Sequence, residues 1–312
     1  MTYDAADIRA AQEHFGFLLP APIEKDFHVL RALVAISSVD TKPFRLIFAG
    51  GTALARAHRL VGRMSEDVDL KIVLAEPTPI SRSQLKRSLS AVRSSVTDAL
   101  LQAGFAFNPR DESQCYAKNE NHYAVYHLPY GDTTVSTHGL RPSIQIELTY
   151  TELRLAPVTL PVSSFLAEAF KNPPELSAID CVNVSETASE KFVALTRRIA
   201  MELAGQSRSP DPTLVRHIYD LHLIKSHIAF RDVAKLARQI ALKDALEYKN
   251  QYPEYHADIN AETRKALDAI EREPFYRERY ASFVTTMVYG DRPEFDEAWA
   301  TIKELADYFF QH

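Results

Sequence analysis

Residues 44–74 read FRLIFAGGTALARAHRLVGRMSEDVDLKIVL, and this stretch decides the fold. The apolar run at 44–49 predicts a buried strand, which Gly50 and Gly51 end before a short helix over 52–59. A second apolar run, at 68–74, predicts another strand. A strand, a glycine turn, a helix and a second strand therefore follow one another closely.

A pair of carboxylates marks the start of the second strand. Asp67 and Asp69 are two positions apart, and side chains at i and i+2 of a strand project from the same face. Two such carboxylates repel each other unless a cation lies between them, and oxygen-only ligands favour Mg²⁺ or Mn²⁺. Glu147, in the apolar run 144–150, is the best candidate for a third metal ligand, because its apolar neighbours are expected to face the core.

The glycine turn suits a phosphate ligand. Gly50 and Gly51 allow the backbone to approach a ligand closely, and the following helix N-terminus presents N–H donors. Thr52 and Ser65 add hydroxyl groups, so we expect these four residues to bind a nucleoside triphosphate. Phosphoryl transfer depends on positioning and charge neutralisation, for which two metal ions about 4 Å apart are well suited. An isolated D-x-D or Gly-Gly pair is common, but their combination around one strand is much more specific.

The periodicity of the remaining chain predicts an α+β core followed by helices. In the first half we expect helices at 23–36, 81–102 and 163–170, strands within 123–126, 144–150 and 179–184, and two or three strands in all between 105 and 165. In the second half we expect helices at 185–203, 212–225, 230–248, 261–272, 276–289 and 293–310. This pattern indicates a catalytic domain over 1–184 and a helical C-terminal domain over 185–312.

Composition narrows the cellular setting. The net charge of -5 argues against wholesale non-specific binding of nucleic acid. Cys115 and Cys181 stand alone, which predicts neither a disulfide framework nor a zinc site. The first residues lack an apolar run, and no stretch approaches the roughly 20 apolar residues of a membrane helix. We therefore expect a cytoplasmic protein with no membrane partner.

Several motifs resemble those of a known family. GGTAL at 50–54 and RMSEDVDL at 63–70 are similar to the G-G-T-A-L … R-x-S-E-D-I-D-L signature of the AbiEii/AbiGii toxins. These are nucleotidyltransferase-like proteins of the DNA polymerase β superfamily. EKD at 24–26, EKFVAL at 190–195 and RHIYDL at 216–221 resemble further motifs of the family. The resemblance spans most of the chain.

The resemblance implies a polymerase β-type nucleotidyltransferase sheet with a helical C-terminal lobe. It also implies use of an NTP with Mg²⁺, a toxin role in phage defence, and a cognate antitoxin. Some members add nucleotides to tRNA 3′ ends, so RNA is the expected acceptor. The family's active-site lysine falls on Lys191 and its distal aspartate on Asp220, which join Asp67 and Asp69 as expected catalytic residues. Lys191 would also contact the nucleotide. His217 departs from the aspartate that many members carry there.

The residues alone leave alternatives open at these positions. Lys191 could be a surface lysine on its helix, and Asp220 could orient Lys191 or pair with Arg216 one turn earlier. Basic residues at helical spacing, Arg231, Lys235 and Arg238, could contact RNA phosphates or simply form a solvated face. For the whole protein, the alternatives are a nucleotidyltransferase acting on a small molecule or a protein, and a regulatory module that binds NTP without turnover.

Overall fold

The computed structural model describes residues 3–76, 79–130, 140–206 and 211–311. The chain forms two compact units. The first comprises Met1–Arg59 and Met64–Val182, and the second comprises Leu60–Arg63 and Asn183–His312. The short segment 60–63 thus belongs with the helical part of the chain, although it lies between two strands of the first unit in sequence. Nothing in its local pattern indicated this.

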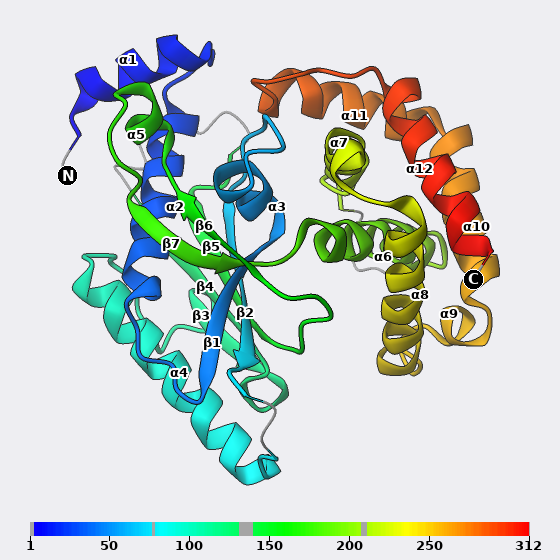
Figure 1. Ribbon diagram of the computed structural model, residues 1–312, viewed down its shortest axis with the longest axis horizontal. Coiled ribbons are helices and arrows are strands. Elements are labelled where there is room, and N and C mark those ends of the chain that lie inside the picture. Colours follow the sequence, from blue (N-terminus) through cyan, green and yellow to red (C-terminus); the bar gives the residue numbers. More distant parts are fainter. Residues whose placement is uncertain (1–2, 77–78, 131–139, 207–210, 312) are drawn as a thin grey trace. The chain divides into compact units, whose positions relative to one another are not determined.

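A mixed seven-stranded sheet forms the centre of the first unit (Figure 1), in the order β3-β4-β5-β2-β1-β7-β6. Its strands are β1 (Phe44–Ala49), β2 (Asp67–Leu74), β3 (Cys115–Lys118), β4 (Tyr123–Pro129), β5 (Ser143–Tyr150), β6 (Val158–Val162) and β7 (Leu176–Cys181). The β2–β5 and β1–β7 pairs are parallel and the other pairs are antiparallel. Among the described residues, the region 105–165 contributes four strands rather than two or three. The α+β class with a mixed sheet is confirmed.

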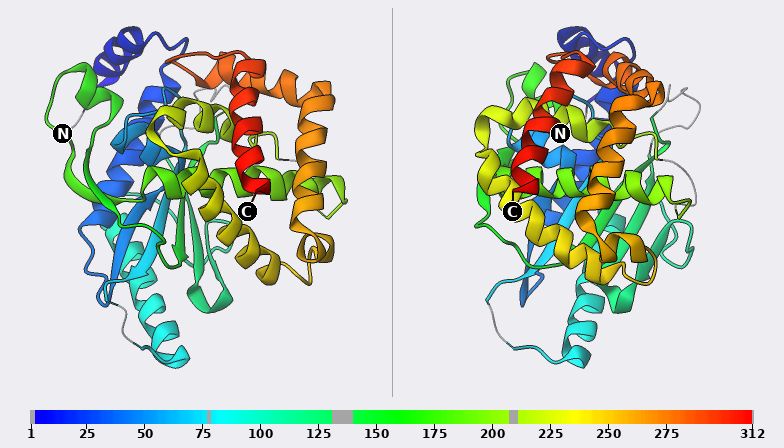
Figure 2. Two further views of the ribbon diagram at one scale, coloured as in Figure 1. Left: turned by 45° about the vertical axis from the view of Figure 1, so that its right-hand side comes forward. Right: turned by 90° about the vertical axis from the view of Figure 1, so that its right-hand side faces the viewer.

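Helices cover one face of this sheet. The helical elements of the first unit are α1 (Ala5–Phe15), α2 (Ala21–Ser37), α3 (Gly50–Thr52), η1 (Ala53–Ala57), α4 (Arg82–Gln102), η2 (Asn119–Asn121) and α5 (Phe165–Ala169). Helices α2 and α4 lie along the same face of the sheet (Figures 1 and 2). The helix expected at 52–59 instead begins at Gly50 and ends at Ala57 after a π turn, because Arg59 adopts a left-handed backbone conformation.

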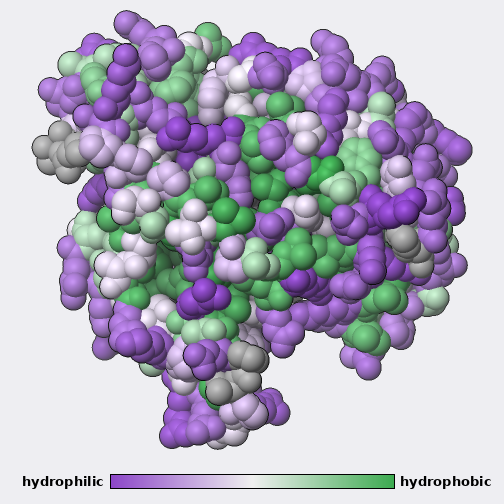
Figure 3. All heavy atoms as spheres, viewed as in Figure 1, coloured by the Kyte–Doolittle hydropathy of each residue, from purple (hydrophilic) through white to green (hydrophobic). Residues whose placement is uncertain are grey.

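Two helix starts illustrate how side chains define these elements. Helix α4 begins with a capping box, in which Ser81 accepts the Gln84 N–H and the Gln84 side chain accepts the Ser81 N–H. Asp4 and Asp7 form the same motif at α1, a helix that the apolar pattern did not predict. Hydrophilic residues dominate the visible surface at the N-terminal end of α4 (Figure 3), as expected for a helix that buries only one side.

The main core determines the orientation of β2 and β5. Apolar residues of α2 and α4 pack against the sheet, where Val68 and Leu70 of β2 and Ile146 and Leu148 of β5 are buried. Because successive strand residues alternate between faces, the positions between these apolar residues project from the opposite face of the sheet. Each buried aliphatic side chain contributes roughly 1.5–3 kcal/mol, and a slip of one residue would expose all four.

The second unit is helical. It contains α6 (Val184–Leu203), α7 (Arg216–Ile224), η3 (Lys225–His227), α8 (Phe230–Glu247), α9 (Pro253–Ala257), α10 (Ile259–Arg272), α11 (Pro274–Met287) and α12 (Phe295–Phe310). Helix α6 lies across α8 and α10 (Figure 2), and α12 packs against α7 and α8. The helices predicted in this half are confirmed, and α9 was not predicted. Among the described residues, no helix combines the length and the apolar character needed to cross a membrane.

Backbone contacts join the segment 60–63 to the residues that directly follow α11. The N–H groups of Tyr289 and Gly290 donate to the Gly62 carbonyl oxygen at 2.9 Å each, and Arg63 forms a bridge with Val288. A Cβ atom on Gly62 would lie 2.7 Å from the Gly290 Cα, so this close approach requires glycine.

A buried ion pair ties α2 to η1 and α5. The Asp26 carboxylate accepts the Phe165 N–H at 2.7 Å and lies 3.3 Å from the Arg56 Nε. The Arg56 guanidinium in turn stacks on the Phe165 ring, 3.6 Å from its centroid. Burial raises the pKa of Asp26 to about 6, although Arg56 and the Phe165 N–H oppose the rise. This cluster joins three elements that are distant in sequence.

The Asp26 carboxylate should make stability depend on pH. Its pKa in the folded state, about 6, lies above its ordinary value of 3.8, so the folded protein binds the proton first as pH falls. Relative to Asp26→Asn, the wild type should therefore gain about 1 kcal/mol of unfolding free energy between pH 7 and pH 5. Urea unfolding of both proteins at the two pH values measures this difference. Equal pH dependence of the two proteins would contradict it.

Candidate active site

Four polar side chains share the face of the sheet opposite the α2–α4 core. In the parallel β2–β5 pair, Asp67 is opposite Gln145 and Asp69 is opposite Glu147. Directly paired residues of neighbouring strands project from the same face, and all four are half-buried. The expectation that Glu147 faces away from the core on a neighbouring strand is therefore confirmed.

Asp69 explains the glycine at position 50. Gly50 has a φ of 75°, a conformation that favours glycine. A Cβ atom there would lie 1.8 Å from Oδ2 of Asp69, so the Asp69 carboxylate packs directly against the Gly50 backbone. Ala49, the residue before the turn, pairs with Asp69 across β1 and β2. Gly50 thus makes room for one of the two aspartates.

The residues after the turn contact the start of β2. Gly51 and Thr52 are buried. The Thr52 hydroxyl donates to the Asp67 carbonyl oxygen and lies 2.8 Å from the Ser65 Oγ. The four residues expected at the nucleotide site, Gly50, Gly51, Thr52 and Ser65, therefore lie around the two aspartates. Among them, the Thr52 hydroxyl links Ser65 to the backbone of Asp67.

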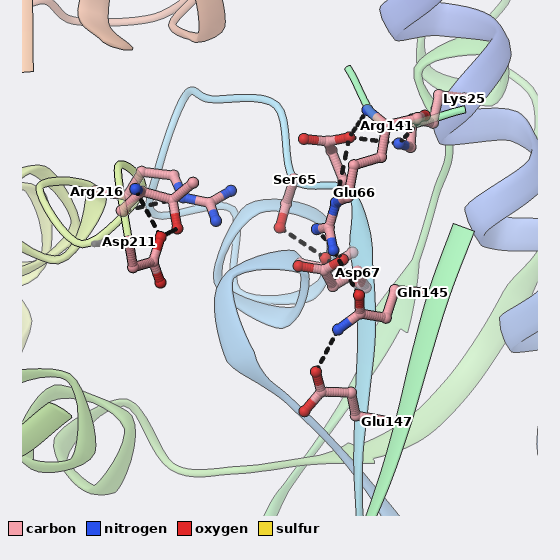
Figure 4. A network of polar contacts seen from close by, with 11 residues as sticks. Lys25, Ser65, Glu66, Asp67, Arg141, Gln145, Glu147, Asp211 and Arg216 are labelled. Carbon is pink, nitrogen blue, oxygen red and sulfur yellow. Dashed lines mark hydrogen bonds and ion pairs between the residues drawn. The ribbon is translucent and has the colours of Figure 1, made fainter. Parts of the chain in front are cut away.

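A chain of hydrogen bonds connects Asp67 to Glu147 (Figure 4). One guanidinium N–H group of Arg141 donates to the Asp67 carboxylate, and another donates to the Gln145 side-chain oxygen at 2.6 Å. The Gln145 amide then donates to Glu147. On the other side, Tyr123 of β4 hydrogen-bonds to Glu147, and burial together with this carboxylate raises the pKa of Tyr123.

The buried Lys25 contacts Arg141, the residue at which this chain of hydrogen bonds begins. The Lys25 ammonium pairs with the Glu66 carboxylate and donates to the Arg141 carbonyl oxygen at 2.7 Å, while Glu66 accepts the Arg141 N–H at 2.7 Å. Burial lowers the pKa of Lys25, and Glu66 opposes that change. Sequence reasoning missed Arg141. Lys25 in the EKD motif at 24–26 and Glu66 were the residues that could have pointed to Arg141, but the sequence does not indicate that either contacts it.

The donor atoms fit a hard divalent cation, because Asp67, Asp69 and Glu147 offer only oxygen ligands from one sheet face. Over the described part of the chain, however, no three His, Cys, Asp or Glu side chains are grouped closely enough to hold a metal. Arg141 engages Asp67 and Gln145 engages Glu147. The three oxygen-donor side chains on one sheet face therefore suit Mg²⁺ or Mn²⁺. In this structure two of them, Asp67 and Glu147, accept hydrogen bonds from Arg141 and Gln145 instead.

The second unit contains Lys191 and Asp220. The Lys191 Nζ lies 2.7 Å from Asp220 Oδ2, and Arg63 donates to both oxygens of the same carboxylate, at 2.6 and 2.7 Å. All three side chains are buried. Burial raises the pKa of Asp220, but Arg63 and Lys191 outweigh it and hold the pKa far below its usual range. Lys191 is therefore no surface lysine, and Asp220 orients it.

Four further residues of this unit were considered in the sequence analysis. Burial and the nearby Lys191 lower the pKa of His217 well below its usual value, so its ring is neutral at pH 7. Arg238 is partly engaged, because it donates to the Asn260 side chain at 2.7 Å and lies near the Phe309 ring. Arg231 and Lys235 are exposed on the same helix.

The mixed seven-stranded sheet and its covering helices place the protein in the α+β fold class. The family model of the nucleotidyl transferase AbiEii toxins of type IV toxin–antitoxin systems matches residues 31–301, so the chain belongs to this family. Among solved structures, MenT4, a nucleotidyltransferase toxin from Mycobacterium tuberculosis H37Rv, superposes with a TM-score of 0.55. That match has 16% sequence identity and covers 100% of this chain and 91% of MenT4. No curated protein matches the sequence.

Substitution of Gly50 should separate backbone strain from displacement of Asp69. Gly16 has a similar φ of 69° but nothing within 4 Å of a Cβ position, so Gly16→Ala measures strain alone. We expect Gly16→Ala to lower the unfolding free energy by about 1–2 kcal/mol. Gly50→Ala should cost clearly more, because the Asp69 carboxylate must also move. Chemical unfolding of both variants measures this, and equal losses would contradict the role of Asp69.

Removal of the Asp220 charge should destabilise the helical unit. Asp220→Asn removes the carboxylate that the buried Arg63 and Lys191 share, and breaking a buried ion pair in this way costs roughly 3–5 kcal/mol. Lys191→Met is the matched control, since Asp220 then keeps Arg63. Asp220→Asn should therefore lower the unfolding free energy more than Lys191→Met does. A smaller loss for Asp220→Asn than for Lys191→Met would contradict the prediction.

Proposed function

We propose that this protein is a metal-dependent nucleotidyltransferase that transfers NMP from an NTP to an RNA acceptor, with a tRNA 3′ end as the first candidate. In this proposal it acts as the toxin of a toxin–antitoxin pair, has a cognate antitoxin and works in the cytoplasm. The observation that carries the proposal is the location of Asp67, Asp69 and Glu147 on one sheet face beside the Gly50 turn, in a member of the AbiEii family.

In the proposed site, Asp67, Asp69 and Glu147 hold Mg²⁺ or Mn²⁺. Bound there, the divalent cations would activate the attacking oxygen and neutralise the leaving pyrophosphate. Gly50, Gly51, Thr52 and Ser65 would bind the triphosphate. The Thr52 hydroxyl supports this site indirectly, because it holds Ser65 and the Asp67 backbone in place.

Lys191 is proposed to contact the phosphates of the nucleotide as a point charge. Two features support this role. Arg63 and Lys191 both pair with the Asp220 carboxylate, so two cationic groups lie side by side in one cluster. Asp220 fixes the Lys191 ammonium in one position, which limits the conformational entropy lost on binding. Asp220 would therefore act through Lys191.

The acceptor is proposed as RNA because of the family to which the chain belongs. The exposed Arg231 and Lys235 are available for phosphate contacts, which would make RNA binding sensitive to salt. The net charge of -5 confines such contacts to local patches.

The proposal is tested by incubating the purified protein with each α-labelled NTP, Mg²⁺ and total RNA. We expect label in RNA with at least one NTP. Asp67→Asn and Asp69→Asn should each lower transfer by at least about 100-fold, since loss of a metal ligand costs more than loss of its supporting residues. Glu112→Gln, which removes an exposed carboxylate of the same unit, is the matched control and should transfer normally.

Two outcomes would overturn parts of this proposal. Label in a small hydroxylated compound or a protein, with RNA unlabelled, would replace the acceptor class. Tight NTP binding without transfer to any acceptor, together with toxicity that survives Asp67→Asn, would reject the enzyme and leave a regulatory nucleotide-binding module.

A further inference from the structure

Arg141 lies where the carboxylate face needs a positive charge. Its guanidinium bonds to Asp67 and to Gln145, and Gln145 in turn bonds to Glu147 (Figure 4). The Arg141 Nε also lies 3.9 Å from Glu66 Oε2. One cationic side chain thus reaches, directly or through an amide, two of the three carboxylates proposed to hold metal. The Arg141 side chain is 39% exposed and that of Asp67 is 22% exposed, so the pair remains accessible to solvent ions.

Both backbone polar groups of Arg141 are hydrogen-bonded, which fixes the position from which its side chain reaches Asp67. The Arg141 N–H donates to Glu66 and its carbonyl oxygen accepts from Lys25, each at 2.7 Å. Lys25 and Glu66 are buried and paired with each other. Because Glu66 directly precedes Asp67, the same buried pair fixes both the arginine and the start of β2. The Arg141 guanidinium therefore contacts Asp67 from a backbone position that Lys25 and Glu66 hold in place.

A cation at Asp67 must compete with this guanidinium. The bonded Asp67 oxygen cannot accept from Arg141 and ligate a metal in the same direction at once, and two cations at hydrogen-bond range of one carboxylate repel each other. A guanidinium displaced from Asp67 loses its hydrogen-bonded anion and keeps only Glu66, which lies 3.9 Å from its Nε and already pairs with Lys25, so a further anion would stabilise it. Phosphate oxygens match its planar fork of donors as well as a carboxylate does.

We propose that Arg141 is the built-in counter-ion of the carboxylate site. It neutralises Asp67 before nucleotide binds, competes there with the divalent cation, and moves to the triphosphate when metal and nucleotide bind together. Metal and nucleotide therefore bind cooperatively, because each removes an electrostatic cost of binding the other. This inference rests on the proposed function, since it takes Asp67 as a metal ligand.

The test measures binding of Mn²⁺ alone, by electron paramagnetic resonance of the free ion, without acceptor or turnover. In Arg141→Gln, Mn²⁺ should bind roughly tenfold more tightly than in the wild type, because a competing and partly exposed charge is gone. A non-hydrolysable NTP should strengthen Mn²⁺ binding in the wild type. In the variant this enhancement should shrink by a similar factor.

Arg45→Gln is the matched control. Arg45 also belongs to the sheet unit, pairs with Asp180 at 3.2 Å, and has similar exposure, 47% for its side chain and 26% for that of Asp180. Arg45 pairs with Val73, four residues along β2 from Asp69, so Arg45→Gln removes the same charge away from the carboxylates and its Mn²⁺ affinity should equal that of the wild type. Arg141→Lys keeps a charge but loses the double hydrogen bond to Asp67 and Gln145, and should lie between the wild type and Arg141→Gln.

The outcomes separate this inference from the proposed function. Equal Mn²⁺ affinity in the wild type, Arg141→Gln and Arg141→Lys, with binding still abolished by Asp67→Asn, overturns the counter-ion role and leaves the metal site intact. Weaker Mn²⁺ binding in Arg141→Gln also overturns it. Absence of Mn²⁺ binding in every variant, with and without nucleotide, overturns both the inference and the metal part of the proposed function. Circular dichroism confirms that each variant is folded before binding is compared.

Discussion

Burial of one face of the sheet determines where the charges of the other face lie. Val68 and Leu70 of β2 and Ile146 and Leu148 of β5 pack under α2 and α4, and strand alternation then directs the intervening residues to the opposite face. The parallel register between the two strands brings Asp69 beside Glu147 and Asp67 beside Gln145. The apolar core thus supplies the free energy that holds several carboxylates close together despite their mutual repulsion.

Several buried charges among the described residues occur in ion-paired clusters, and each of these clusters joins segments that are distant in sequence. Asp26 and Arg56 fasten α2 to the element after the glycine turn. Lys25, Glu66 and Arg141 fasten α2 to the start of β2, and Asp220 receives both Arg63 and Lys191. Because an unpaired buried charge is expensive, these partners specify which segments meet. The motifs that resemble the AbiEii/AbiGii family supply several of these charges.

The family and the fold agree with each other. The AbiEii family model covers residues 31–301, and the likeness to MenT4 extends over the whole chain at the level of fold. In this protein Arg141 neutralises part of the negative charge of the carboxylate face, and the neutral Gln145 links Arg141 to Glu147.

The sequence by itself determined the features that depend on local periodicity. It predicted β1, β2, β4, β5 and most helices, the common face of Asp67 and Asp69, and Glu147 on a neighbouring strand, because alternation and helical spacing are written into adjacent residues. It missed the polar α1 and short elements such as α9, which have little apolar pattern. Only the tertiary structure decided the partners: Arg141 for Asp67, Lys25 for Glu66, and Arg63 for an aspartate 157 residues away. Such pairings arise where the folded chain brings distant segments together, and no local pattern encodes which charge will meet which.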